Sequence, residues 1–151
     1  MIENKEKPYL SIAAICQQVL QEKDEVLSGI RFIDTLTLTT QGDNPPEALP
    51  PFAIGVSAIV AFKSGLARGK RNVSIALYSP NGEKLTSTAP QTVIFQEDHQ
   101  GVNIIMRMEV VTKLEGLYWF DVLMDEELVT RMPLRIIYAP DQAAEPEQQK
   151  K

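Results

Sequence analysis

Alternation of apolar and polar residues with a period of two is the feature that most constrains how this chain folds. From Val102 to Val110 the even positions are all apolar, whereas Arg107 and Glu109 occupy odd positions. Because successive side chains of an extended strand point to opposite faces, this pattern predicts a half-buried β-strand. Residues 73–78 alternate in the same way, with the odd positions facing inward.

Residues 52–62 carry apolar side chains at the even positions and mostly small residues between them. We interpret this segment as a central strand that is covered on both faces. Turn signals separate the strands, and the strongest is the Ser-Pro-Asn-Gly sequence at 79–82, because Asn-Gly accepts the positive φ of a tight hairpin turn. About seven or eight strands at this spacing predict an all-β fold, a single antiparallel β-sandwich of the immunoglobulin-like or Greek-key type.

The chain has 151 residues, which is the size of one domain. Residues 1–7 are mostly polar, and residues 139–151 contain no large apolar side chain. We therefore expect flexible tails at 1–7 and 139–151 and a sandwich domain at 8–138. No apolar stretch approaches the ~20 residues that cross a bilayer, and the charged N-terminal segment does not resemble a signal peptide. We expect a soluble cytoplasmic protein with no membrane contact.

The last two predicted strands form a hairpin whose register can be derived from the alternation. Residues that face each other in a hairpin share a face, and a two-residue loop would pair even with odd positions. We therefore predict a three-residue loop at Asp125–Glu127 and an ion pair between Asp121 and Arg131, worth about 0.2–1 kcal/mol. The other predicted pairs are Met124 with Leu128, Phe120 with Met132, Tyr118 with Leu134 and Trp119 with Pro133. Residues 115–118 also resemble a turn that enters a late sandwich strand with a tyrosine at the corner.

The N-terminal third allows two interpretations. Five apolar residues have the spacing of an amphipathic helix: Ile12, Ile15, Cys16, Val19 and Leu20. Positions 10, 12, 14 and 16 alternate equally well as a strand. Periodicity alone leaves helix and strand open for this segment. Residues 26–38, in contrast, are too rich in β-branched side chains to be helical.

Several short segments resemble a known bacterial family. They are Ile-Cys-Gln-Gln-Val at 15–19, the charged turn at 22–25, Gly-Ile-Arg-Phe-Ile-Asp at 29–34, Tyr-Ser-Pro-Asn-Gly at 78–82, Gly-Leu-Tyr-Trp-Phe at 116–120 and Pro-Leu-Arg-Ile at 133–136. Together they are similar to an uncharacterised family of small stand-alone β-sandwich proteins, a domain of unknown function, over most of residues 8–138. The resemblance implies a first strand paired with residues 26–40, and it implies no activity, cofactor or catalytic residue. On this basis we predict a strand at about 9–16 and allow a short helical turn near 17–24.

Composition excludes several classes of function. Lys and Arg total 15 against 20 Asp and Glu, so the net charge of −5 disfavours nucleic acid as the partner. One cysteine rules out an internal disulfide and a four-cysteine zinc site. One histidine removes most catalytic and metal-binding arrangements. We therefore predict that the protein is not an enzyme and uses no cofactor.

Three residues are candidate reactive groups: Cys16, Asp34 and His99. His99 lies in the polar segment Gln96–Gly101, and we interpret it as part of a solvated loop. Cys16 lacks a nearby base in the sequence, so we expect a buried thiol that acts as a small hydrophobic side chain. Asp34 falls on an apolar even face, where either a bulge at Ile33 turns it outward or it is buried and hydrogen-bonded. We expect a structural role for Asp34.

The segment 63–71 is basic, with no acidic residue. Its four cationic side chains are Lys63, Arg68, Lys70 and Arg71. They could bind phosphate, nucleic acid or another anionic ligand. Because the whole chain is acidic, solvation of a loop between two strands is the favoured interpretation, and anion binding is the alternative function.

One strand face carries more apolar residues than solvent exposure favours. We call it the Trp119 face, and it comprises Leu117, Trp119 and Leu123 on one strand with Pro133 and Ile137 on its neighbour. Contiguous exposed apolar surface usually marks an interface, although another strand could equally cover this one. We therefore predict a non-enzymatic binding or interaction module whose ligand is a protein partner or a second copy of the chain.

Overall fold

The computed structural model describes residues 7–40 and 52–140, and within these residues it contains ten strands and no helix. The strands are β1 (Tyr9–Gln21), β2 (Leu27–Phe32), β3 (Thr35–Thr40), β4 (Phe52–Lys63), β5 (Gly69–Tyr78), β6 (Lys84–Ser87), β7 (Gln91–Phe95), β8 (Gly101–Thr112), β9 (Gly116–Met124) and β10 (Glu127–Pro140). The number exceeds our expectation because the N-terminal third forms three strands and residues 84–95 form two short ones. No helix of the described residues is long and apolar enough to cross a membrane.

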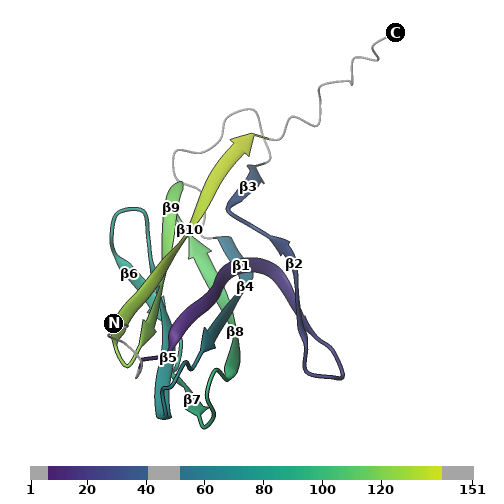
Figure 1. Ribbon diagram of the computed structural model, residues 1–151. Coiled ribbons are helices and arrows are strands. Elements are labelled where there is room, and N and C mark those ends of the chain that lie inside the picture. Colours follow the sequence, from purple (N-terminus) through teal and green to yellow (C-terminus); the bar gives the residue numbers. More distant parts are fainter. Residues whose placement is uncertain (1–6, 41–51, 141–151) are drawn as a thin grey trace.

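The strands form two sheets that pack face to face (Figure 1). One has the order β2-β1-β4-β8, and the other has the order β3-β10-β9-β5-β6 with β7 also paired to β5. All pairs are antiparallel except β3 with β10. The main core takes Phe62 and Met106 from the four-stranded sheet and Leu77, Phe120 and Leu134 from the six-stranded sheet. The prediction of an all-β sandwich is confirmed.

Strand β4 is an inner strand of its sheet and is buried on both faces from Val56 to Phe62. Its even residues join the main core. Ile59 points the other way and packs in a second small cluster with Cys16 and Val19. The small residues between the large ones let the strand fit between these two layers, as the sequence pattern predicts.

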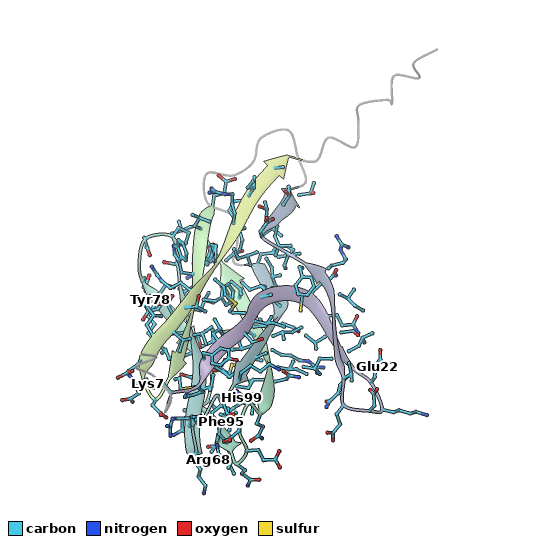
Figure 2. The ribbon with its side chains drawn as sticks, viewed as in Figure 1. Lys7, Glu22, Arg68, Tyr78, Phe95 and His99 are labelled. Atoms are coloured by element: carbon cyan, nitrogen blue, oxygen red, sulfur yellow. The ribbon has the colours of Figure 1, made fainter. Side chains whose placement is uncertain are left out.

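Strand β1 corrects one of our predictions. It continues to Gln21, and a turn at 22–26 leads into β2, so residues 17–21 are not helical. These residues pair with β2 in an antiparallel hairpin that projects from the sandwich, with Glu22 near its end (Figures 1 and 2). The apolar spacing was ambiguous because Ile15 faces the main core while Cys16 and Val19 belong to the second cluster.

The chain changes sheets at Ile33 and Asp34. The Ile33 N–H donates to the Ile15 carbonyl of the four-stranded sheet, and the Arg135 N–H donates to the Asp34 carbonyl beside the six-stranded sheet. Only residues 27–32 of the segment 26–40 therefore pair with β1, and 35–40 pair with β10 instead. The interruption at Ile33 turns Asp34 into solvent, which is the first of the two alternatives for this residue.

The final hairpin confirms most of the predicted register. Arg131 pairs with Asp121, Met132 with Phe120, Pro133 with Trp119 and Leu134 with Tyr118. The loop, however, has two residues, Asp125 and Glu126, both at positive φ. A bulge between Leu128 and Thr130 then restores the register. The predicted pair of Met124 with Leu128 is therefore wrong, and Leu128 lies opposite Leu123 with 55% of its surface exposed.

The turns fit the sequence analysis. The Ser79–Gly82 turn joins β5 to β6, with Gly82 at a φ of 85° and its N–H donating to the Ser79 carbonyl. Tyr118 closes the corner into β9, because its hydroxyl donates to the Leu114 carbonyl at 2.7 Å. Strand β10 runs to Pro140, two residues past the predicted domain end. The rest of the predicted tails lies outside the described residues, apart from Lys7.

Candidate functional site

The register of three strands assembles the Trp119 face on the outer side of the six-stranded sheet. Trp119 lies between Tyr78 on β5 and Pro133 on β10. In the next row, Asp121 lies between Ala76 and Arg131. The inward-facing neighbours of these residues fill the main core, so parity alone directs this set outward.

Arg131 binds two neighbours on this face at once. Its Nε donates to the Asp121 carboxylate at 2.7 Å, as predicted. Its guanidinium carbon also lies 4.6 Å from the centre of the Trp119 ring, which is cation–π geometry. The Asp121 side chain is only 14% exposed, so its ion pair is better shielded from water than an ordinary surface pair. Arg131 is therefore held in one position above the tryptophan.

The five predicted residues of the Trp119 face differ in exposure. Leu117, Trp119 and Leu123 are half-buried, whereas Pro133 and Ile137 are exposed. Within residues 7–40 and 52–140, no third layer of strands or helix packs on this side of the sheet. Arg131 of the neighbouring strand lies over the Trp119 ring. This face is an open surface with one ordered aromatic side chain at its centre.

A groove of about 370 Å³ opens beside Arg131, between β1 of one sheet and β10 of the other. Its lining includes Ala13, Phe32 and Asp34 as well as Arg131 and Pro133. The Arg135 N–H points away from β9, toward Asp34, so the nitrogen of Pro133 two residues earlier points to the same side. Proline is tolerated in this strand because its missing N–H falls on the groove side and not in the ladder with β9. No sequence pattern indicates this groove, because its walls are distant in the chain.

The basic segment does not form a cluster of free cations. Arg68 is ion-paired with Asp98 from the loop before β8. Arg71 lies 3.6 Å from Asp125 at the tip of the β9–β10 hairpin. Two of the four predicted anion-binding cations thus have carboxylate partners from distant loops. The sequence alone could not reveal these pairs, because only the fold brings the loops to the same end of the sandwich.

The two other predicted cations add little to a common site. Lys63 ends β4, and Lys70 is the second residue of β5, where it lies opposite Ile94. Both are exposed side chains on different strands. The structure therefore spreads the four positive charges along the end of the sandwich without directing them at one point.

The single histidine and the single cysteine occupy different environments. His99 is exposed in the loop before β8, where its backbone N–H donates to the Gly65 carbonyl (Figure 2). Cys16 is fully buried, and burial raises the pKa of its thiol while a hydrogen bond with the Gln18 backbone opposes that rise. Thiolate is the reactive form of cysteine, so burial makes Cys16 inert. Among the described residues, no group of three or more histidine, cysteine or acidic side chains could hold a metal ion.

Comparisons with known proteins give the family of the chain but not its function. Residues 11–137 match a family of unknown function (DUF6941). No curated protein matches the chain. Among solved structures, 55 chains match.

Two solved structures illustrate the likeness. The alkylpurine DNA glycosylase AlkC of Pseudomonas fluorescens, bound to DNA containing an abasic site analog, is 8% identical with a TM-score of 0.53. The match covers 87% of this chain but 31% of the glycosylase chain, so this chain spans about a third of that enzyme. An immunoglobulin-like protein from Pseudomonas aeruginosa is 10% identical with a TM-score of 0.45, over 88% of this chain and 98% of that one. At such identities the likeness concerns the fold alone.

Proposed function

We propose that this chain, which belongs to a family of unknown function (DUF6941), is a non-enzymatic interaction module of the bacterial cytoplasm. Its protein partner docks on the Trp119 face. The observation that carries the proposal is Arg131, held above Trp119 by its ion pair with Asp121 on an open sheet surface. The proposal includes no catalytic role, because the histidine is exposed in a loop and the cysteine is buried.

The chemistry of the Trp119 face fits protein recognition. Tryptophan and arginine are the residue types that most often dominate the binding energy of interfaces. Because Arg131 is already fixed by two contacts, a partner would bind it with a smaller loss of side-chain entropy. Half-buried Leu117 and Leu123 surround this pair with apolar surface that a partner can cover. A planar surface with an ordered centre suits a folded protein better than a small molecule.

The alternative function, binding of phosphate, nucleic acid or another anion through the 63–71 segment, has weaker support. Arg68 and Arg71 already interact with Asp98 and Asp125, so an anion would have to compete with carboxylates. Binding by this segment would weaken steeply as salt is added, because it would depend on charge alone. Binding by the Trp119 face would depend much less on salt.

The test compares two matched substitutions. Ile137→Asp introduces a charge into the Trp119 face at a side chain that is 38% exposed, and Ile30→Asp introduces the same charge at a side chain on β2 that is 37% exposed. Trp119→Asp serves as a second variant of the face. Each purified variant is checked by circular dichroism and thermal melting, then immobilised to capture proteins from an extract of the native host. Any captured protein is purified and titrated against each variant by calorimetry.

The proposal predicts one pattern of results. Wild type and Ile30→Asp bind the purified partner with similar affinity, and both variants of the Trp119 face lose at least tenfold in affinity. Equal affinity for wild type, Ile137→Asp and Trp119→Asp would refute the proposal. Binding that is lost on reversing Arg68 and Arg71, and that falls steeply with salt, would support the anion-binding alternative instead.

A further inference from the structure

Strand β8 is the longest edge strand of the sandwich. It has 12 residues and pairs along its whole length with β4, whereas the edge strands β2, β3 and β6 have 6, 6 and 4 residues. On its other side, β8 has no neighbouring strand among the described residues (Figure 1). It contains no proline, and its register with β4 shows no bulge. Proline and bulges are two of the devices that protect an edge from pairing, and β8 has neither, so its edge is open to a further strand.

The direction of the free backbone groups on β8 can be derived. The Ile105 carbonyl accepts a hydrogen bond from the Gln91 side chain at 3.4 Å, so it points away from β4. Because backbone groups alternate along a strand, those of Arg107, Glu109 and Val111 point away from β4 as well. These are the residues available for pairing with another strand. Gln91 occupies one lone pair of the Ile105 carbonyl and leaves the second for a further donor.

The side chains along this edge are self-complementary. If two copies of β8 pair antiparallel about a two-fold axis at Met108, Arg107 of each copy lies opposite Glu109 of the other. The same register places Val111, which is 44% exposed, opposite Ile105. A two-fold axis at residue 107 or 109 would instead place like charges opposite each other, and an axis at residue 110 would place Arg107 opposite Lys113. Opposite charges across a strand pair stabilise it and like charges destabilise it, so the axis at Met108 is favoured over these three.

We propose that a second copy of this chain binds through β8, joining two four-stranded sheets into one continuous sheet of eight strands. Each of the two Arg107–Glu109 pairs exchanges two backbone hydrogen bonds in this register. The contact is isologous, because the same residues serve both copies, and it therefore closes at a dimer. It uses a surface separate from the Trp119 face, so it goes beyond the proposed function and does not depend on it.

The test reverses the charges one at a time and together. Arg107→Glu places glutamates opposite each other, and Glu109→Arg places arginines opposite each other; both side chains are exposed in the single chain. The double variant Arg107→Glu/Glu109→Arg restores the opposite charges in reverse order. Lys84→Glu on β6 is the control for Arg107→Glu, since it changes the net charge by the same amount at another exposed site. Sedimentation velocity over a range of concentrations measures the association constant of each full-length chain.

The expected outcome is a concentration-dependent dimer for wild type and Lys84→Glu. Each single reversal lowers the association constant by about tenfold or more, while the double variant and an equimolar mixture of the two single variants associate like wild type. A wild type that stays monomeric at millimolar concentration, or a double variant as weak as the single ones, would overturn the proposal. Dimerisation that survives all reversals at residues 107 and 109 but is lost in Trp119→Asp would assign the contact to the Trp119 face instead.

Discussion

The hydroxyl of Tyr118 offers a quantitative test of how the corner into β9 is stabilised. It donates to the Leu114 carbonyl at 2.7 Å and accepts from the Leu114 N–H at 3.3 Å. Tyr118→Phe removes both bonds and keeps the ring, which is 1% exposed and therefore retains its full burial. A hydrogen bond contributes about 0.5–1.5 kcal/mol net, and the second bond is long, so we expect a loss of about 1–2 kcal/mol in the free energy of unfolding.

The exposure of Leu114 limits this value. Leu114 is 43% exposed, so water can replace the lost partner and the loss stays below that of a fully buried unpaired carbonyl. For a domain of this size the loss corresponds to a fall in Tm of about 3–8 °C. The free energy of unfolding is measured by urea titration at pH 7, with an unchanged m value as the sign that the unfolded state is unaffected.

The same variant predicts a change with pH. Burial raises the pKa of the Tyr118 phenol above its ordinary value of 10.0, and the nearby Tyr138 raises it further, while hydrogen bonds with the backbone of Leu114 and Lys113 oppose the rise. The unfolded chain releases this proton from about pH 10, and the folded chain releases it only at higher pH. The contribution of Tyr118 is therefore complete below pH 10 and is lost as the pH rises through the folded pKa. The stability difference between wild type and Tyr118→Phe should narrow above pH 10.

Tyr138→Phe is the matched control for the hydrogen bond. Among residues 7–40 and 52–140, the buried Tyr138 hydroxyl has no hydrogen-bond partner, so its removal should leave stability unchanged or raise it by up to about 1 kcal/mol. Equal losses in both variants would mean that the corner hydrogen bond is not the cause. If the difference in the free energy of unfolding between wild type and Tyr118→Phe stays constant from pH 8 to pH 11, the raised pKa of the Tyr118 phenol is refuted.

Two further substitutions test the turn before β9 and the centre of the Trp119 face. Gly116 has a φ of 132°, and an added Cβ would lie 2.9 Å from the Cβ of Pro80. Gly116→Ala should therefore lower the free energy of unfolding, measured by urea titration, by about 1–3 kcal/mol. A loss below about 0.5 kcal/mol would contradict backbone strain at this position. Arg131→Met leaves the mostly buried Asp121 carboxylate without its partner and should lower stability by about 1–2 kcal/mol. It should also shift the fluorescence of Trp119, the only tryptophan in the chain, and an unchanged spectrum would mean that the guanidinium is not on the ring in solution.

Alternation predicted the faces of most strands because a strand has no freedom in how successive side chains point. Val73, Ile75 and Leu77 face the core, as do the even residues of β8, and Trp119 and Pro133 face outward as a pair. The same argument placed the Trp119 face correctly on the outer side of a sheet. This prediction requires only whether each residue number is odd or even within its strand, which can be read from the sequence.

The errors arose where the backbone departs from a regular strand. The turn Asp125–Glu126 has two positive φ values without glycine, and the Asp125 carboxylate and N–H bond to the backbone of Asn72 on β5. This anchor lies 53 residues away in the chain, so the local sequence does not indicate it. The bulge that follows rotates Leu128 outward, and a strand pattern cannot mark a bulge in advance.

The candidate site was predictable where it depends on neighbouring strands and unpredictable where it depends on loops. The contact of Arg131 with Asp121 follows from hairpin register, but its position above Trp119 depends on side-chain geometry. The partners of Arg68 and Arg71 come from loops that meet only in the folded chain. Proximity in the sequence therefore does not indicate which of the four basic residues have carboxylate partners in the fold.

The parallel pairing of β3 with β10 sets an order of events during synthesis. Thr35 leaves the ribosome 100 residues before Arg135, its partner in the register. The four-stranded sheet is complete in sequence once β8 ends at Thr112, whereas the other sheet must wait for β10 to join β9 and β3. Until then, the core face of the nascent four-stranded sheet is exposed to water. Chaperones that bind apolar surface would bind the chain during that interval. The interval would end when β10 leaves the ribosome and joins β9 and β3.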